Sequence, residues 1–232
     1  RALRQRRRRH QGLTVKRRPL VILVQLPIPP AGPEPIRGNV PLAAGYLRLF
    51  ARERGLEDSF DIEILPARAA STLGDRALLE EIVERRPWLA GFTCYLWNVD
   101  RTLWLATRIK ECLPETRILL GGPEITPDNA WVLEKESIDY AAVGEGEQTF
   151  AALLRVLGPG GAAAAWPQDD SGLLSIPGLA HRRGGGLRSG PPRQPLSHLD
   201  SISSPYLAGI LNAGEEEQLL LETVRGCIFK CK

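Results

Sequence analysis

Two cysteines near the end of the 232-residue chain carry the most specific chemistry in the sequence. Cys227 and Cys231 are separated by three residues and follow Arg225-Gly226. Two thiolates on one short loop can reach the same metal centre, and they are ligands of zinc and of iron–sulfur clusters. The C-x3-C spacing alone also fits two core thiols, half of a zinc site or a redox pair. The residues before it, and the elements that position it, decide between these alternatives.

Glycines and aromatic residues gather in three other segments, each directly after an apolar run. These segments are Thr93–Asn98 (TCYLWN), Gly121–Glu124 (GGPE) and Gly144–Glu147 (GEGE). Glycines at strand ends let the backbone approach a ligand and present N–H groups to phosphate or amide oxygens. The rings of Tyr95 and Trp97 offer flat apolar surface to a large planar ligand. Each glycine alone indicates only a tight turn, but three such loops predict a binding edge.

The elements that must position these loops follow from the hydrophobic pattern. Apolar runs predict strands at Leu20–Leu26, Asp61–Leu65, Leu89–Cys94, Arg117–Leu120 and Tyr140–Val143. Helical spacing predicts helices at Val40–Arg54, Leu73–Arg86, Val99–Leu113, Asp128–Lys135 and Gln148–Leu157. Alternating strands and helices form βαβ units and a parallel sheet. We therefore expect a five-stranded, doubly wound α/β domain over residues 19–157, with ligands beyond the carboxyl ends of its strands.

The remaining residues form smaller units. Residues 1–18 are a basic tail with nine Lys or Arg and no acid. Residues 158–217 are interpreted as a linker that contains a short hairpin, turning at Gly184-Gly185-Gly186, and a short helix after Pro205. The apolar run Leu219–Val224 predicts the first strand of another domain, which begins at residue 218 and is cut off at residue 232.

Composition is that of an ordinary globular chain, 43% hydrophobic and 25% charged. No apolar run is long enough for a transmembrane helix, and no signal peptide follows the basic start. Four cysteines make no disulfide framework in a chain of this size, which favours a reducing cytoplasm. Without residues 1–18 the chain has 21 basic and 27 acidic residues, so nucleic-acid binding is not expected. The absence of Met indicates a fragment open at both ends.

The cysteine segment resembles a known signature. Glu222-Thr223-Val224-Arg225-Gly226, followed by Cys227 and Cys231, is similar to the opening of the radical S-adenosylmethionine (SAM) enzymes, which carry C-x3-C-x2-C. The segment Asn39–Tyr46 (NVPLAAGY), together with TCYLWN, GGPE and GEGE, resembles the cobalamin-binding domain of cobalamin-dependent radical SAM proteins. The likeness covers about residues 19–157 and continues to the cysteines. It implies that the chain ends inside the motif, at the start of a radical SAM barrel.

The resemblance implies a five-stranded flavodoxin-like (Rossmann-like) cobalamin-binding domain, with the corrin over the strand ends and the nucleotide tail between sheet and helix. The residues that would face the corrin are Thr93, Tyr95, Leu96, Trp97 and Asn98. Those that would border the tail are Gly121, Gly122, Pro123, Gly144, Glu145 and Gly146. Cys227 and Cys231 would be two of the three thiolate ligands of a 4Fe-4S cluster that binds SAM. No catalytic residue is assigned.

One departure from related cobalamin domains is informative. Domains of the methionine synthase type place a histidine, from D-x-H-x-x-G, beneath the cobalt. Here His10, His181 and His198 all lie outside the predicted sheet domain. The expected state is therefore cobalamin with its own base displaced and no histidine ligand.

The resemblance implies a radical SAM enzyme of the methyltransferase class, although some relatives cyclise or rearrange their substrates. It would need an unidentified small-molecule substrate and a reductant for the cluster, and residues 1–232 alone would be inactive. The alternative is a non-catalytic flavodoxin-like module that binds a corrinoid or a nucleotide.

Overall fold

The computed structural model describes residues 17–29, 32, 36, 38–158, 169–212 and 218–226. The strands are β1 (Leu20–Gln25), β2 (Asp61–Ile64), β3 (Leu89–Thr93), β4 (Arg117–Gly121), β5 (Tyr140–Ala142), β6 (Leu179–Arg183) and β7 (Gly186–Ser189). The α-helices are α1 (Leu42–Arg52), α2 (Ala67–Thr72), α3 (Asp75–Arg85), α4 (Val99–Cys112), α5 (Ala130–Leu133), α6 (Gly146–Leu157) and α7 (Ser171–Leu174). Two 3-10 turns, η1 (Leu56–Asp58) and η2 (Leu199–Ser201), complete the described elements.

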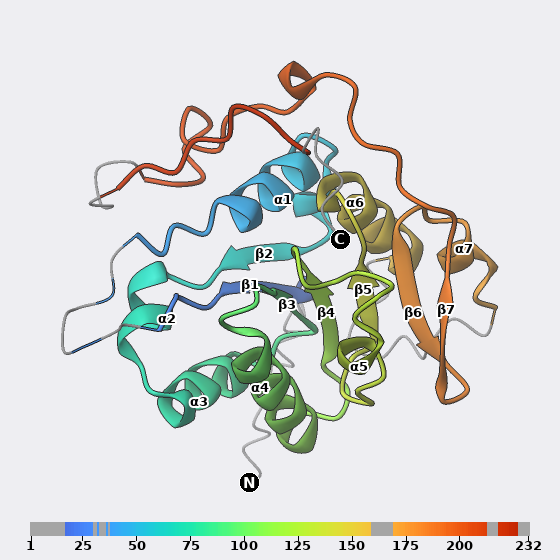
Figure 1. Cartoon of the computed structure of the whole chain (residues 1–232), viewed down its shortest axis with the longest axis horizontal. Coiled ribbons are helices and arrows are strands. Elements are labelled where there is room, and N and C mark those ends of the chain that lie inside the picture. The colour runs from blue at the N-terminus through green and yellow to red at the C-terminus, as the bar shows by residue number, and fades with distance from the viewer. Residues whose placement is uncertain are drawn as a thin grey trace, which may run out of the picture.

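The strands form one sheet in the order β2-β1-β3-β4-β5-β6-β7 (Figure 1). β1 to β5 are paired in parallel, which confirms the predicted five-stranded parallel sheet. The order 2-1-3-4-5 is that of flavodoxin-like folds. The chain passes from β1 to β2 on one side and then crosses to β3 on the other side of β1, so the switch point lies between β1 and β3. Ligands of such sheets bind in the crevice at the carboxyl ends of the strands there.

Helices cover both faces of the sheet (Figure 1). On one face, α1 and α6 contribute Phe50 and Phe150 to an apolar cluster with strand residues. On the other face, α3 and α4 contribute Leu78 and Ile109 to a second cluster. Because both faces are covered, the four central residues of β1, Val21–Val24, are all buried. None of the helices in the described residues has the length and apolar content needed to cross a membrane.

The hairpin predicted within residues 173–195 forms and joins the main sheet. β6 pairs antiparallel with β5, and β7 pairs antiparallel with β6 across the glycine turn. The sheet therefore extends past residue 157 to Ser189. His181 on β6 lies opposite Tyr140 of β5, so the sheet contains a histidine although residues 19–157 contain none. The turn is a local signal, whereas the pairing of β6 with β5 is a tertiary contact.

The strand predicted at Leu219–Val224 is absent from the structure, where these residues have no regular secondary structure. A strand needs a neighbouring strand to satisfy its backbone hydrogen bonds. Here the backbone of Leu220 pairs with a side chain: its N–H donates to the Tyr206 hydroxyl at 3.3 Å, and that hydroxyl donates to its carbonyl oxygen at 3.1 Å. In Figure 1 residues 218–226 run over α1 as an irregular segment.

Candidate functional site

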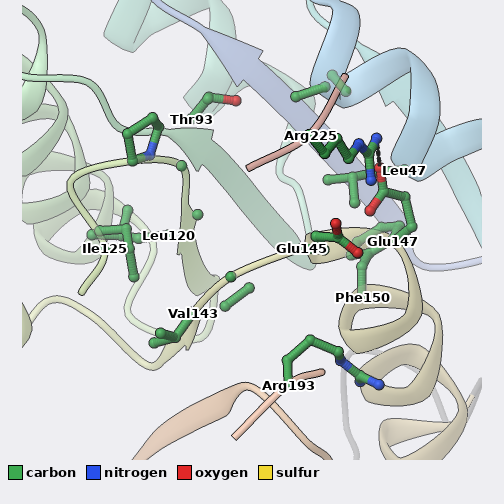
Figure 2. Close-up of a pocket in the computed structure, with 18 of the residues that line it drawn as sticks. Leu47, Thr93, Leu120, Ile125, Val143, Glu145, Glu147, Phe150, Arg193 and Arg225 are labelled. Carbon is green, nitrogen blue, oxygen red and sulfur yellow. Dashed lines mark hydrogen bonds and ion pairs between the residues drawn. The ribbon is translucent and has the colours of Figure 1, made fainter. Parts of the chain in front are cut away.

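A cavity of about 1150 Å³ opens at the carboxyl ends of β3, β4 and β5. The three glycine- and aromatic-containing loops of the sequence all contribute to it (Figure 2). Helices α1 and α6 supply Leu47 and Phe150, and the chain beyond the hairpin supplies Arg193 and Leu196. The last described residues, 222–226, form another part of the wall. The cavity lies at the edge where flavodoxin-like sheets bind their ligands.

The Gly121-Gly122 step brings the ends of β3 and β4 into close contact. Gly122 has a φ of +106°, and a Cβ built on it would lie 2.6 Å from the carbonyl oxygen of Cys94. Only glycine fits this position, since both the backbone angle and the space exclude a side chain. At Gly121, by contrast, an added Cβ would meet only the Cβ of Ala142, at 3.9 Å. Because Gly121 lines the cavity, its missing side chain leaves room for a ligand.

The Gly144–Glu147 segment joins β5 to α6 and holds the neighbouring chain in place. Gly144 has a φ of +84°, which glycine adopts without strain. The Glu145 carboxylate accepts the backbone N–H of Leu196 at 2.7 Å. Glu147 lies in the first turn of α6, where the helix dipole favours a negative charge. This loop therefore borders the cavity and also fixes a second segment that lines it.

The loop after β3 places its residues in three different settings. Thr93 and Tyr95 line the cavity. Leu96 and Trp97 do not line it; they are exposed, and the Trp97 ring stacks on the Tyr95 ring with centroids 4.5 Å apart. The stacked pair gives a flat aromatic surface beside the cavity.

Asn98 holds this loop from inside the protein, although the resemblance placed it against the corrin. Its side chain is 1% exposed and does not line the cavity. The Asn98 Oδ1 accepts the N–H of Tyr95 at 2.9 Å, and the Nδ2 donates to the carbonyl oxygens of Leu26 and Thr93 at 3.1 and 3.2 Å. The amide therefore ties the β3 loop to the end of β1.

Sequence reasoning missed two arginines in the cavity wall. Arg193 donates to Gln148 Oε1 at 2.9 Å, to Thr149 Oγ1 and to the carbonyl oxygen of Pro177 at 2.8 Å, and so fixes the post-hairpin chain to α6. Arg225 pairs with Glu147 at 2.6 Å (Figure 2). No local pattern marks Arg193, while Arg225 is marked only by its place before Cys227.

Arg225 carries a stable charge at this site. Burial by itself lowers the pKa of its guanidinium, but hydrogen bonds and charges from Glu147 and Glu222 outweigh burial and hold the pKa above its usual value. Tyr46 lies next to these groups. Burial is the largest cause that raises the pKa of its phenol, and the negative charge of Glu222 raises that pKa further. The guanidinium lies 5.4 Å from the centre of the Tyr46 ring.

Cys94 is a packing residue, as its buried position between β3 and the Gly122 loop indicates. Burial raises the pKa of its thiol to about 12. Thiol alkylation proceeds through the thiolate, and a three-unit rise leaves roughly 1000-fold less of it at a given pH. We expect iodoacetamide at pH 8 to alkylate the exposed Cys112 and spare Cys94 in the folded protein. In urea both should react, and mass spectrometry of tryptic peptides measures each; equal rates in the folded state would contradict the burial of Cys94.

The predicted cluster ligands Cys227 and Cys231 lie outside the described residues. Within the described part of the chain, no group of three or more His, Cys, Asp or Glu side chains is arranged to hold a metal ion. Neither His181 nor His198 lines the cavity; His181 is buried and its Nε2 lies 3.2 Å from Asp170. No described histidine is therefore placed to bind a metal in the cavity.

The open parallel sheet and the glycine-lined cavity at the carboxyl ends of its strands define a flavodoxin-like cofactor-binding domain. Residues 40–154 match the B12 binding domain family. The chain therefore contains a B12-binding domain and is similar to a cobalamin-dependent radical SAM methyltransferase, as the sequence resemblance predicted.

Three relatives illustrate this relationship. The chain is 30% identical over 202 residues to the cobalamin-dependent radical SAM methyltransferase TokK of Streptomyces tokunonensis, covering 83% of this chain and 28% of TokK. It is 27% identical to the 2-(S-pantetheinyl)-carbapenam-3-carboxylate methyltransferase of Streptantibioticus cattleyicolor, covering 83% of this chain and 28% of that enzyme. The cobalamin- and SAM-bound radical enzyme OxsB shares the fold, with a TM-score of 0.55 at 15% identity over 83% of this chain and 25% of OxsB. The chain thus spans less than a third of each relative.

The cavity fits a ligand of the size of cobalamin. Its volume of about 1150 Å³ lies above the ~300–1,000 Å³ range of common small-molecule pockets. Gly121 and Gly122 together keep the edge of β4 free of side chains, so a large group can lie against the backbone. The shape and the lining therefore agree with the B12 family match.

Proposed function

We propose that this chain binds cobalamin in the cavity and forms the N-terminal part of a radical SAM enzyme of the methyltransferase class. One observation carries the proposal: the three loops singled out in the sequence converge on one large cavity inside the region that matches the B12 binding domain. Two relatives that match most of this chain are methyltransferases, and one of them, TokK, is a cobalamin-dependent radical SAM enzyme, which supports the reaction class.

Each lining group has a role in this proposal. Thr93 and Tyr95 would face the corrin, and the Trp97 ring stacked on Tyr95 would extend the flat surface outside the cavity. Six residues border the nucleotide tail: Gly121, Gly122, Pro123, Gly144, Glu145 and Gly146. Cobalamin, when bound, supplies a cobalt centre able to carry a methyl group. Among the described residues no histidine lines the cavity, so none of these side chains would supply an imidazole to the cobalt.

The remaining cofactors belong to the whole protein. We propose that Cys227 and Cys231 are two ligands of a 4Fe-4S cluster that binds SAM, and that a reductant supplies its electron. The position of residues 222–226 in the cavity wall supports this, because the cysteines follow that wall directly in the sequence. The substrate is a small molecule whose identity is set elsewhere in the protein.

Binding of hydroxocobalamin to residues 1–232 tests the proposal. The protein is loaded anaerobically, passed through gel filtration and examined by visible absorption. We expect one equivalent of cobalamin to remain bound, with a spectrum in which the cofactor's own base is displaced. Loss of all cobalamin on the column would contradict the proposal. Retention of ATP or flavin mononucleotide in its place would favour the nucleotide-binding module.

A further inference from the structure

Residues 218–226 lie on the domain with little apolar burial. The side chains of Leu219, Leu221 and Val224 are 55%, 69% and 73% exposed. Hydrophobic contacts therefore contribute little to holding this segment in position. Its attachment depends on polar contacts, of which the Tyr206–Leu220 hydrogen bonds are one set.

Arg225 is the exception in this segment. It is the one residue of 218–226 that is not exposed, and its side chain is 14% accessible. Its Nη2 lies 2.6 Å from Oε1 of Glu147 and 2.9 Å from Oε2 of Glu222, and its guanidinium lies beside the Tyr46 ring. Figure 2 shows Arg225 and Glu147 pointing toward each other across the cavity wall. A single guanidinium thus joins the end of the segment to α1 and α6.

Glu147 needs this partner. Its side chain is 7% exposed, and a buried carboxylate is costly unless it is paired and hydrogen-bonded. Glu222 contacts the same nitrogen of Arg225, but it lies three residues away in the same segment. The Glu222 pair therefore shapes the segment internally, and of the two carboxylates only Glu147 joins Arg225 to the domain. Buried ion pairs of this kind select one geometry more than they add stability.

We infer that Arg225 and Glu147 form a clamp that fixes residues 222–226 at the cavity and so sets the distance from the cavity to the point in the chain that directly precedes Cys227 in the sequence. Cys227 follows Arg225 by two residues, and Glu147 lies in the first turn of α6, next to Gly144 and Glu145 of the cavity. The two are positioning residues: they hold one cofactor segment at a defined place relative to the other. The meaning of that distance rests on the proposed function, whereas the clamp itself is a property of the cofactor-free chain.

Spin-label distances test the clamp without any cofactor. One nitroxide is attached to Cys112, which is exposed at the end of α4, and the other to Val224→Cys, in a Cys227→Ser/Cys231→Ser background that leaves Cys94 buried. Double electron–electron resonance on the frozen chain should give one narrow distance peak. We expect Glu147→Gln and Arg225→Gln each to abolish that narrow peak. The distance distribution of the double variant should be no broader than that of either single variant, because both substitutions remove the same interaction.

Glu222→Gln is the matched control, since it removes a carboxylate from the same guanidinium nitrogen and leaves the tie to α6. It should keep the narrow peak. A narrow peak in Arg225→Gln, or equal broadening in Glu222→Gln, would overturn the clamp. Thermal unfolding of each variant shows whether the domain is intact. Arg225 lies outside the sheet and helices, so its variant remains informative if Glu147→Gln fails to fold.

A second distance separates this inference from the proposed function. For this measurement Cys112→Ser leaves residue 224 as the one labelled position, and the bound cobalamin is reduced to its cobalt(II) form. The parent chain should give a single distance from the cobalt to the label at residue 224. Arg225→Gln should lose that single distance. Because Val224 lines the cavity, cobalamin binding is first measured on the unlabelled parent chain. Failure of that chain to bind cobalamin would refute the proposed function, while the cofactor-free distances would still decide the clamp. Bound cobalamin with an unchanged distance in Arg225→Gln would overturn the clamp alone.

Discussion

Phenylalanine in place of Gly121 is expected to lower the affinity for cobalamin by at least ~100-fold, which corresponds to about 3 kcal/mol. A Cβ at Gly121 meets only Ala142, at 3.9 Å, so the backbone tolerates the substitution and the ring projects into the cavity. A close-packed site has no space for both the ring and a large cofactor. Gel filtration with hydroxocobalamin, followed by the visible spectrum of the protein fraction, measures the loss.

Gly74→Phe provides the matched control for this variant. Gly74 has ordinary backbone angles and open space around its Cβ position, and it does not line the cavity. The same ring placed there should leave binding unchanged. Gly122→Ala is a different test, since its Cβ meets the Cys94 backbone at 2.6 Å and its φ is positive. It should destabilise folding by about 2 kcal/mol or more. Full retention of cobalamin by a folded Gly121→Phe would contradict the assigned cavity.

Replacing Asn98 by alanine is expected to lower the free energy of unfolding by about 3 kcal/mol, from three hydrogen bonds at about 1 kcal/mol each. The buried amide binds the Tyr95 N–H and two carbonyl oxygens, and alanine leaves all three groups without that partner. Since Tyr95 lines the cavity, cobalamin affinity should fall too, although Asn98 does not touch the cavity. Urea unfolding followed by circular dichroism measures the stability change.

Leu96→Ala is the control for Asn98, because it lies in the same loop with a side chain 76% exposed. Its unfolding free energy should change by less than about 0.5 kcal/mol. If Asn98→Ala were as stable as the parent, the loop would not depend on the amide. If Leu96→Ala proved the more destabilising of the two, the loop would be packed differently from the structure.

Local signals in the sequence were enough for the parallel sheet and for the three loops that meet at the cavity. A few neighbouring residues are enough to indicate each element. Buried apolar runs indicate β1 and β3, and apolar residues at helical spacing indicate α1 and α4. Chain order then placed the strand-end loops at one edge, because parallel strands share the direction of their carboxyl ends. Of the eleven predicted cofactor-binding residues, the eight that line the cavity are Thr93, Tyr95, Gly121, Gly122, Pro123, Gly144, Glu145 and Gly146.

The loop after β3 shows where local reading stopped. Leu96 and Trp97 project from the surface, and Asn98 points into the protein toward the carbonyl oxygen of Leu26, 72 residues earlier in the chain. Sequence spacing puts these three side chains in one segment, but the turn at the end of β3 sends them in different directions. The orientation depends on partners from another strand, which no short window contains.

The sequence by itself determined the alternation of strands and helices, the glycines at the strand ends and the spacing of the two cysteines. Tertiary structure alone decided that β6 joins β5, that Leu219–Val224 forms no strand, and that Arg225 pairs with Glu147, 78 residues away. The reason is physical. Hydrophobic periodicity and backbone freedom are properties of neighbouring residues, whereas strand pairing and buried ion pairs exist only once distant segments have been brought into contact.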